Sequence, residues 1–106
     1  AESALRAGML CSEADGIVRK IIDDAGYGKC FGHSLGHGVG LFIHEAPNLS
    51  PHAGERRLHP GNIVTVEPGI YIEGRCGVRI EDMALIEEGG ARILTSCPKE
   101  LIELCV

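Results

Sequence analysis

Three histidines lie within a short glycine-rich stretch, residues 32–47, with the sequence GHSLGHGVGLFIHEAP. They are His33, His37 and His44. Imidazole readily serves as a metal ligand, or as a general acid and base near neutral pH. Glycine lets the backbone turn tightly and approach a ligand closely, and it disfavours a helix. We therefore expect a short strand and turn that present the three imidazoles toward one site.

Two glutamates interrupt apolar segments farther along the chain. Glu67 ends the run IVTVEPG, and Glu81 lies inside VRIED. A carboxylate in an apolar strand is costly to bury unless it is paired, although either glutamate alone would also suit a surface position. With His37 they form a set of hard ligands that suits Mn²⁺, Co²⁺, Fe²⁺ or Zn²⁺. Arg79, two residues before Glu81, is placed to hydrogen-bond a ligating carboxylate.

The N-terminal part of the chain is predicted to form two helices. Residues 2–10 carry apolar side chains at helical spacing, although no capping residue marks the start of this helix. Ser12 is a favoured N-cap for the second helix, with Asp15 in the capping-box position. Gly26 is expected to end that helix at its C′ position.

The rest of the chain is predicted to form a mostly antiparallel sheet. The expected elements are a strand over residues 63–66 that Pro68-Gly69 ends and that resumes over 70–72, a turn at 73–75, a long strand over 78–86, a turn at 88–90 into a strand over 92–94, and a short helix over 98–104. Two helices followed by such a sheet are typical of the α+β class.

Composition and charge exclude several classes of protein. One hundred and six residues allow one domain, and a formal net charge of −5 disfavours nucleic acid or an anionic membrane as a partner. No apolar run approaches the roughly 18 residues of a membrane span, and the first ten residues lack the pattern of a signal peptide. Five cysteines without a CxxC pair argue against a disulfide framework, so we expect a reducing, cytoplasmic setting.

Three phrases, GHSLGHGVGLFIHEAP, VTVEPGIYI and GVRIED, follow one another in an order that resembles the M24 metallopeptidases of pita-bread fold. Within that family they look most like the Xaa-Pro peptidases, of the aminopeptidase P and prolidase type. The resemblance extends over nearly the whole chain and includes the helix SEADGIVRKIIDDAGYG. It implies that residues 1–106 form the C-terminal half of a pita-bread catalytic domain.

The resemblance implies a set of metal ligands. His37 and Glu67 match ligands of the family, and Glu81 matches the glutamate that bridges two metal ions. Arg79 matches the arginine that supports the bridging glutamate.

The resemblance also implies roles in catalysis. His33 and His44 match the two histidines that contact substrate and steady the tetrahedral intermediate. In the implied mechanism a hydroxide between two divalent ions attacks the scissile carbonyl, and Glu67 acts as proton shuttle. His44 would donate a hydrogen bond to the developing oxyanion.

The family site has five protein ligands, and two of them are aspartates that lie upstream of the segment matched here. The acidic residues before the histidines match neither aspartate; they are Glu2, Glu13, Asp15, Asp23 and Asp24. We therefore expect at most one divalent ion per chain, held weakly and often absent, with Mn²⁺ or Co²⁺ ahead of Zn²⁺ or Fe²⁺. Peptidase activity of this chain by itself is expected to be weak or absent.

Two classes of function remain open. The first is a metal-dependent peptidase, or part of one, whose substrate is a peptide with proline in second position. The second is a non-catalytic module that retains the fold and acts through protein–protein association. A methionine aminopeptidase-type enzyme is a further alternative because it shares the GHG and HE elements, whereas EPGIYI and GVRIED look more like the proline-specific branch.

Assembly is also predicted. If the chain is one half of a domain with pseudo-twofold symmetry, apolar surface would lack its cover at Ile63, Val64, Val66, Ile70 and residues 17–22. Exposed patches of that kind usually bind a partner. We expect a homo-oligomer, or association with the missing N-terminal half.

Four further residues are interpreted as surface or structural. His52 and His59 lie in a polar loop and match no ligand of the family. Cys76 lies near the tip of a hairpin without an assignable basic partner, so it is not expected to be a nucleophile. Tyr71 follows Glu67 and is expected in the core or on the sheet surface.

Overall fold

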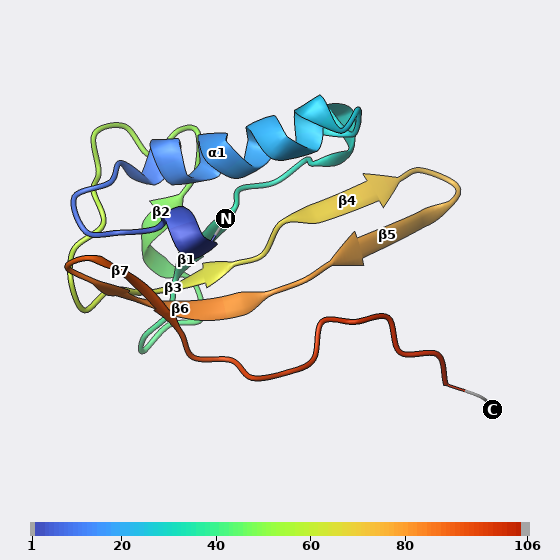
Figure 1. Ribbon diagram of the computed structural model, residues 1–106. Coiled ribbons are helices and arrows are strands. Elements are labelled where there is room, and N and C mark those ends of the chain that lie inside the picture. The colour runs from blue at the N-terminus through green and yellow to red at the C-terminus, as the bar shows by residue number, and fades with distance from the viewer. Residues whose placement is uncertain (1, 105–106) are drawn as a thin grey trace.

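The computed structural model describes residues 2–104, and it consists of one α-helix that crosses one side of an antiparallel sheet (Figure 1). In chain order the elements are the 3-10 turn η1 (Glu2–Ala4), α1 (Cys11–Asp24), the 3-10 turn η2 (Gly28–Cys30), β1 (Gly36–Gly38), β2 (Glu45–Leu49), β3 (Ile63–Val66), β4 (Gly69–Ile72), β5 (Cys76–Arg79), β6 (Asp82–Glu87) and β7 (Gly90–Ile93). The predicted α+β class is confirmed. None of the helices in the described part of the chain has the length and apolar character needed to cross a membrane.

Helix α1 buries one face in the core. Ala14, Val18 and Ile22 recur at helical spacing and are buried, together with strand residues Leu49, Val64, Val66, Ala84 and Ile86. The helix ends as predicted, with Gly26 at C′ and a φ of +85°. The amide of Tyr27 donates to the carbonyl of Ile22 (3.0 Å), which is the closing bond of a glycine-ended helix.

The predicted cap of α1 is wrong. The N-cap position is Leu10, no side chain caps the helix, and Ser12 lies inside it. Asp15 is fully buried, and its carboxylate accepts a hydrogen bond from the amide of Leu35 (2.9 Å) rather than from the start of its own helix. The carboxylate that the local pattern assigns to a helix cap therefore binds a residue that is distant in sequence.

The helix predicted over residues 2–10 is also wrong, because only the short turn η1 forms there. Leu5 and Met9 are buried, as their apolar character indicates. The amide of Gly8 donates to the carbonyl of Leu58, and the amide of Leu58 donates to the carbonyl of Met9, both at 2.9 Å. These bonds to a distant loop replace the hydrogen bonds of a helix.

The main sheet has five strands in the order β2-β1-β3-β6-β7, and all neighbours are antiparallel. The predicted strands over residues 63–66 and within the histidine stretch are confirmed as β3 and β1. A Cβ atom on Gly36 would collide with the backbone carbonyl of Thr65 on β3. Glycine at this position therefore lets β1 lie close against β3, and it brings His37 beside that strand.

A second sheet, the hairpin β4-β5, extends beyond the main sheet (Figure 1). The last pair of the main sheet is Val66 with Asp82, and the first pair of the hairpin is Gly69 with Arg79. Residues 67–68 and 80–81 lie outside both ladders, partly because Pro68 has no amide proton to donate. The predicted end of the first strand at Pro68-Gly69 is confirmed, although residues 70–72 belong to the second sheet rather than continuing the first. The long strand predicted over 78–86 is wrong, because it is interrupted opposite that point. Glu67 and Glu81 both lie in this break.

The helix predicted over residues 98–104 does not form, and the chain runs extended beneath the hairpin (Figure 1). Thr95 and Lys99 both contact the carboxylate of Asp82 on β6, which is buried. Burial raises the pKa of Asp82, but hydrogen bonds with Glu2, Lys99 and Thr95 outweigh it and lower the pKa to about 2. Ion pairing to β6 thus replaces local helical bonds in this segment.

Part of the apolar surface that was predicted to lack cover is covered by the chain itself. Val64 and Val66 are buried in the core, which corrects that prediction, whereas Ile21 is 57% exposed. An apolar cleft of about 330 Å³ lies between α1 and the hairpin, lined by Val18, Ile21, Ile22, Pro68, Gly69, Ile70, Val78 and Ile80.

Candidate active site

All three histidines of the glycine-rich stretch reach one open cavity of about 400 Å³. They come from the loop before β1, from β1 itself and from the residue before β2. The cavity is lined by His33, Ser34, Gly36, His37, His44, Asn48, Ser50, Glu67 and Arg79. Of the six predicted site residues, only Glu81 is absent from this lining.

His37 and Glu67 face each other across the cavity floor and are both largely buried. Nε2 of His37 lies 3.0 Å from Oε1 of Glu67. Nδ1 of His37 lies 3.0 Å from the carbonyl oxygen of Gly38, which can only accept, so Nδ1 carries the proton of a neutral ring. In that tautomer Nε2 presents a lone pair to a carboxylate oxygen. Two acceptors so close need a cation between them, either a proton on the ring or a metal ion.

Thr65 links these two residues. Its hydroxyl accepts a hydrogen bond from the amide of His37 (3.0 Å) and donates one to Oε1 of Glu67 (2.9 Å). Thr65 is 3% exposed, so neither bond competes with open solvent. Because Thr65 and Glu67 are two apart on an extended chain, the spacing alone could have shown that they share a face.

Arg79 contacts Glu67 rather than the glutamate that it was predicted to support. Its guanidinium lies 3.8 Å from Oε2 of Glu67 and is half exposed. Glu81 is exposed and lines the groove beside residues 97–102 rather than the cavity that contains Glu67. Among residues 2–104 no three His, Cys, Asp or Glu side chains are close enough to hold one metal ion. The structure therefore brings together two of the three predicted ligands.

His44 packs edge-on against His37. Their ring centroids lie 4.3 Å apart with an interplanar angle of 61°, and His44 itself is exposed at the mouth of the cavity. His44 is thus accessible to a molecule that enters the cavity.

His33 is held by two neighbours. Its Nδ1 donates to the carbonyl of Ser34 (2.8 Å), so Nε2 of the neutral ring accepts from the hydroxyl of Tyr71 (3.3 Å). Tyr71 lies on the hairpin, where a Cβ atom on either Gly69 or Gly77 would collide with its side chain. The sequence interpretation of Tyr71 as core or sheet surface missed this contact, because β4 and the loop before β1 are distant in sequence.

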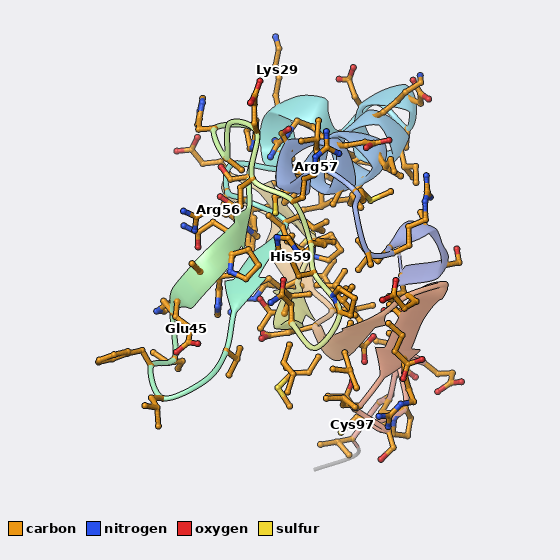
Figure 2. All side chains as sticks on the ribbon, turned by 90° about the vertical axis from the view of Figure 1, so that its left-hand side faces the viewer. Lys29, Glu45, Arg56, Arg57, His59 and Cys97 are labelled. Carbon is orange, nitrogen blue, oxygen red and sulfur yellow. The ribbon has the colours of Figure 1, made fainter. Side chains whose placement is uncertain are left out.

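The remaining reactive side chains lie on the surface, as predicted. His52 and His59 are exposed, and Figure 2 shows His59 with Arg56 and Arg57 on the loop between β2 and β3. Cys76 is exposed at the start of β5. The cysteines Cys11, Cys30, Cys76 and Cys97 are all free, and Cys105 lies outside the described residues.

The geometry of His37 and Glu67 fits part of a metal site. Two ligand bonds of about 2.1 Å at a right angle place the ligand atoms about 3 Å apart, which is the separation observed here. Imidazole with carboxylate is a donor set for hard or borderline divalent ions. The residues described here supply these two ligands and not a complete coordination shell.

Comparison with known proteins finds a consistent set of relatives. The model of metallopeptidase family M24 matches residues 1–88. An Xaa-Pro dipeptidase of Pyrococcus furiosus is 52% identical over 102 residues, which cover 96% of this chain and 29% of that protein. The structure of an Xaa-Pro dipeptidase from Bacillus anthracis has a TM-score of 0.94 at 50% identity, covering 97% of this chain and 29% of the other.

An X-Pro aminopeptidase from Thermotoga maritima has a TM-score of 0.90 at 42% identity, covering 94% of this chain and 28% of the other. The chain thus spans less than a third of the length of these relatives. It shares their fold over nearly all of its own length, as the resemblance to half of a pita-bread domain implied. The chain therefore belongs to metallopeptidase family M24, and the relatives named here are Xaa-Pro peptidases.

Proposed function

We propose that this chain forms part of the catalytic site of a metal-dependent peptidase that cleaves peptides with proline in second position. The observation that carries the proposal is the close approach of Nε2 of His37 to Oε1 of Glu67, at 3.0 Å. Nδ1 of His37 donates its proton in a hydrogen bond to a backbone carbonyl, which leaves the lone pair of the other nitrogen free for a cation. Relatives named Xaa-Pro dipeptidase support the substrate class.

His37 and Glu67 would hold the metal, and Thr65 would keep the carboxylate of Glu67 turned toward it. A divalent ion at such a site supplies an activated water and polarises the scissile carbonyl. The donor types suit Mn²⁺ or Co²⁺ ahead of Zn²⁺ or Fe²⁺, and we expect at most one ion per chain from the ligands described. Glu81 would join them only with a change in the break between β5 and β6.

The other residues of the cavity would bind substrate. His33 and His44 lie on opposite sides of His37 in the chain, and both line the cavity with a ring edge that can reach a peptide. Arg79 is half exposed beside Glu67, so its guanidinium adds positive charge where an anionic group of a short peptide would lie.

We place this chain at the C-terminal part of a catalytic domain, with further metal ligands contributed from outside it. The relatives are more than three times as long, and the described residues provide two ligands where a catalytic metal ion usually has at least three. The free cysteines fit a reducing compartment, and we propose the cytoplasm.

The test is to measure hydrolysis of an Xaa-Pro dipeptide and of its Xaa-Ala counterpart by the full-length protein with added Mn²⁺. We expect metal-dependent cleavage of the Xaa-Pro peptide and no cleavage of the Xaa-Ala peptide. Cleavage of neither peptide, with a folded protein and bound metal, would instead favour the non-catalytic module.

A further inference from the structure

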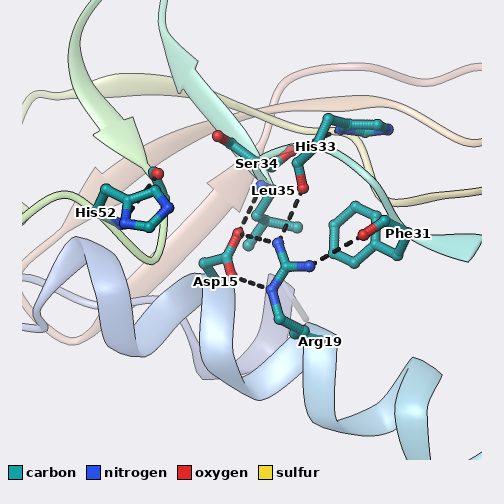
Figure 3. A network of polar contacts seen from close by, with 8 residues as sticks. Asp15, Arg19, Phe31, His33, Ser34, Leu35 and His52 are labelled. Carbon is teal, nitrogen blue, oxygen red and sulfur yellow. Dashed lines mark hydrogen bonds and ion pairs between the residues drawn. The ribbon is translucent and has the colours of Figure 1, made fainter. Parts of the chain in front are cut away.

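An ion pair on α1, with a buried carboxylate and a partly exposed guanidinium, lies beside the segment that carries His33 (Figure 3). Nε of Arg19 donates to Oδ2 of Asp15 (2.8 Å), and NH2 of Arg19 lies 3.1 Å from Oδ1. Asp15 is fully buried, and hydrogen bonding to Asp15 raises the pKa of Arg19 above its usual range. Because its carboxylate is wholly buried, this ion pair differs from a solvated contact between two surface side chains.

The remaining hydrogen bonds of the pair are all formed with one short segment, residues 31–35. NH1 of Arg19 donates to the carbonyl of Phe31 (3.1 Å), and NH2 donates to the carbonyl of His33 (2.9 Å). Oδ1 of Asp15 accepts from the amide of Leu35 (2.9 Å). The guanidinium also lies over the ring of Phe31, 4.4 Å from its centroid. Three points of backbone are thus fixed on both sides of one histidine.

The side chain of His33 takes its position from this backbone. Its ring packs edge-on against Phe31, with centroids 5.1 Å apart, and its Nδ1 donates to the carbonyl of Ser34. Both partners lie inside the segment held by Arg19 and Asp15. The other ring nitrogen, Nε2, accepts a hydrogen bond from the hydroxyl of Tyr71. A shift of this segment would therefore move the ring, its tautomer-fixing bond and its packing partner together.

We propose that Asp15 and Arg19 are positioning residues of the candidate site, which set the place and tautomer of His33 by holding the backbone of residues 31–35. The proposal rests on the proposed function in that His33 contacts substrate there. Lysine cannot replace Arg19 in this role, because a single ammonium group does not offer the planar fork that reaches a carboxylate and two carbonyls at once.

The same helix contains a matched control. Lys20 and Asp24 form an ion pair with the same spacing of four residues, at 2.8 Å, but their side chains are 74% and 62% exposed. This second pair makes no hydrogen bond to the site segment in the described part of the chain. Lys20→Ala therefore removes an ion pair of the same spacing, and a positive charge as well, without touching the site segment.

The test is a double-mutant cycle in the full-length protein. Arg19→Lys and Lys20→Ala are each made alone and each combined with His33→Ala. We expect Arg19→Lys to lower kcat/KM for an Xaa-Pro dipeptide about tenfold or more, and Lys20→Ala to leave it unchanged. In the His33→Ala background Arg19→Lys should have no further effect, because its route of action is gone. An equal loss in both backgrounds, or no loss in either, would overturn the proposal.

A second measurement does not depend on activity. The ¹⁵N signals of the His33 ring report its tautomer, and hydrogen exchange of the Leu35 amide reports the bond to Asp15. In Arg19→Lys, the ring signals should approach those of exposed His52 and the Leu35 amide should exchange faster, whereas Lys20→Ala should match the parent. If Arg19→Lys does not fold, Asp15→Asn serves in its place. Ring signals and amide exchange that match those of the parent would refute the positioning role. This result does not depend on catalysis: a protein that cleaves no peptide but shows the predicted changes would contradict the proposed function and leave the positioning role supported.

Discussion

The hydroxyl group of Thr65 donates a hydrogen bond of 2.9 Å to Oε1 of Glu67, the same oxygen that faces Nε2 of His37. The hydroxyl also accepts the amide proton of His37. One buried threonine therefore sets the relative position of both candidate metal ligands. Partners that orient a ligand in this way typically contribute 10- to 100-fold to metal affinity.

Replacing Thr65 by valine should weaken Mn²⁺ binding by about tenfold, because the carboxylate of Glu67 loses its fixed orientation. The buried amide of His37 would also lose its acceptor, which should lower the free energy of unfolding by roughly 1–3 kcal/mol. Titration calorimetry with Mn²⁺ and urea unfolding measure the two effects. Thr65→Ser is the control, since it keeps the hydroxyl; equal Mn²⁺ affinity of the valine and serine variants would contradict this role.

Replacing Gly36 by alanine should destabilise the fold by roughly 1–3 kcal/mol, because the added methyl group meets the backbone of β3 rather than a movable side chain. Gly89→Ala is the matched control, since Gly89 has open space at its Cβ position. Thermal unfolding compares the two variants. If Gly36→Ala melted at the parent's temperature, β1 and β3 could not be as close as described.

Asp82 should make the fold sensitive to acid. Its pKa is about 2 in the folded protein, below its usual 3.8. The stabilisation is therefore present above about pH 4 and is lost as the pH falls toward 2. The free energy of unfolding of the parent, measured with urea, should decrease as the pH falls over that interval. Asp82→Asn should be less stable at neutral pH and should show a shallower decline, and an identical decline in both proteins would contradict the assignment.

The cysteines should differ sharply in reactivity. Burial raises the pKa of Cys11, and its sulfur has no access to solvent, whereas Cys76 and Cys97 are exposed. In a Cys105→Ser variant at pH 8, a thiol reagent should modify Cys76 and Cys97 quickly and Cys11 only on unfolding. Mass spectrometry of peptides identifies the modified residues. Rapid modification of Cys11 in the folded protein would show that the core opens more readily than its packing indicates.

Exposed apolar side chains favour association of the protein with a further copy of itself. Leu41, Phe42 and Ile43 are 100%, 72% and 75% exposed in the loop between β1 and β2, and the cleft between α1 and the hairpin is also apolar. We predict a homodimer or higher oligomer. Sedimentation velocity at micromolar concentration measures this, and a monomer without concentration dependence would exclude it.

Much of the site could be predicted because its residues lie in short segments with a strong local signature. The glycines around His37 indicate a strand that can approach its neighbours closely, and Gly36 does so against β3. Glu67 stands out because it ends an apolar strand. Both inferences need only the types and spacing of neighbouring residues, and the structure brings these two side chains together.

The rest depends on contacts between segments that are distant in sequence. Asp15 has the spacing of a capping residue, but its carboxylate binds the amide of Leu35, twenty residues away. Lys99 belongs to the segment that was predicted to be helical, but it contacts Asp82 on β6, as Thr95 does. In each case a buried carboxylate binds a partner that is distant in sequence, and this contact takes the place of the local hydrogen bonds that were predicted.

The break at Glu81 was missed for a similar reason. Residues 78–86 alone have the alternation of a continuous strand, and only their pairing with the segment around Pro68-Gly69 shows that they leave the ladder there. At this break Glu81 lines a different groove from the cavity that contains Glu67. The position of the third predicted ligand therefore depends on how two strands bend together.

The most direct test of the central proposal is the metal dependence of Xaa-Pro hydrolysis in the protein as its own gene encodes it. The parent should lose activity when chelated and regain it with Mn²⁺. His37→Asn and Glu67→Gln should each lower kcat/KM by at least about 100-fold, since each removes one ligand of the ion, and His59→Asn should behave as the parent. Hydrolysis that persists after complete chelation, or that survives in both ligand variants, would contradict a metal site built on His37 and Glu67.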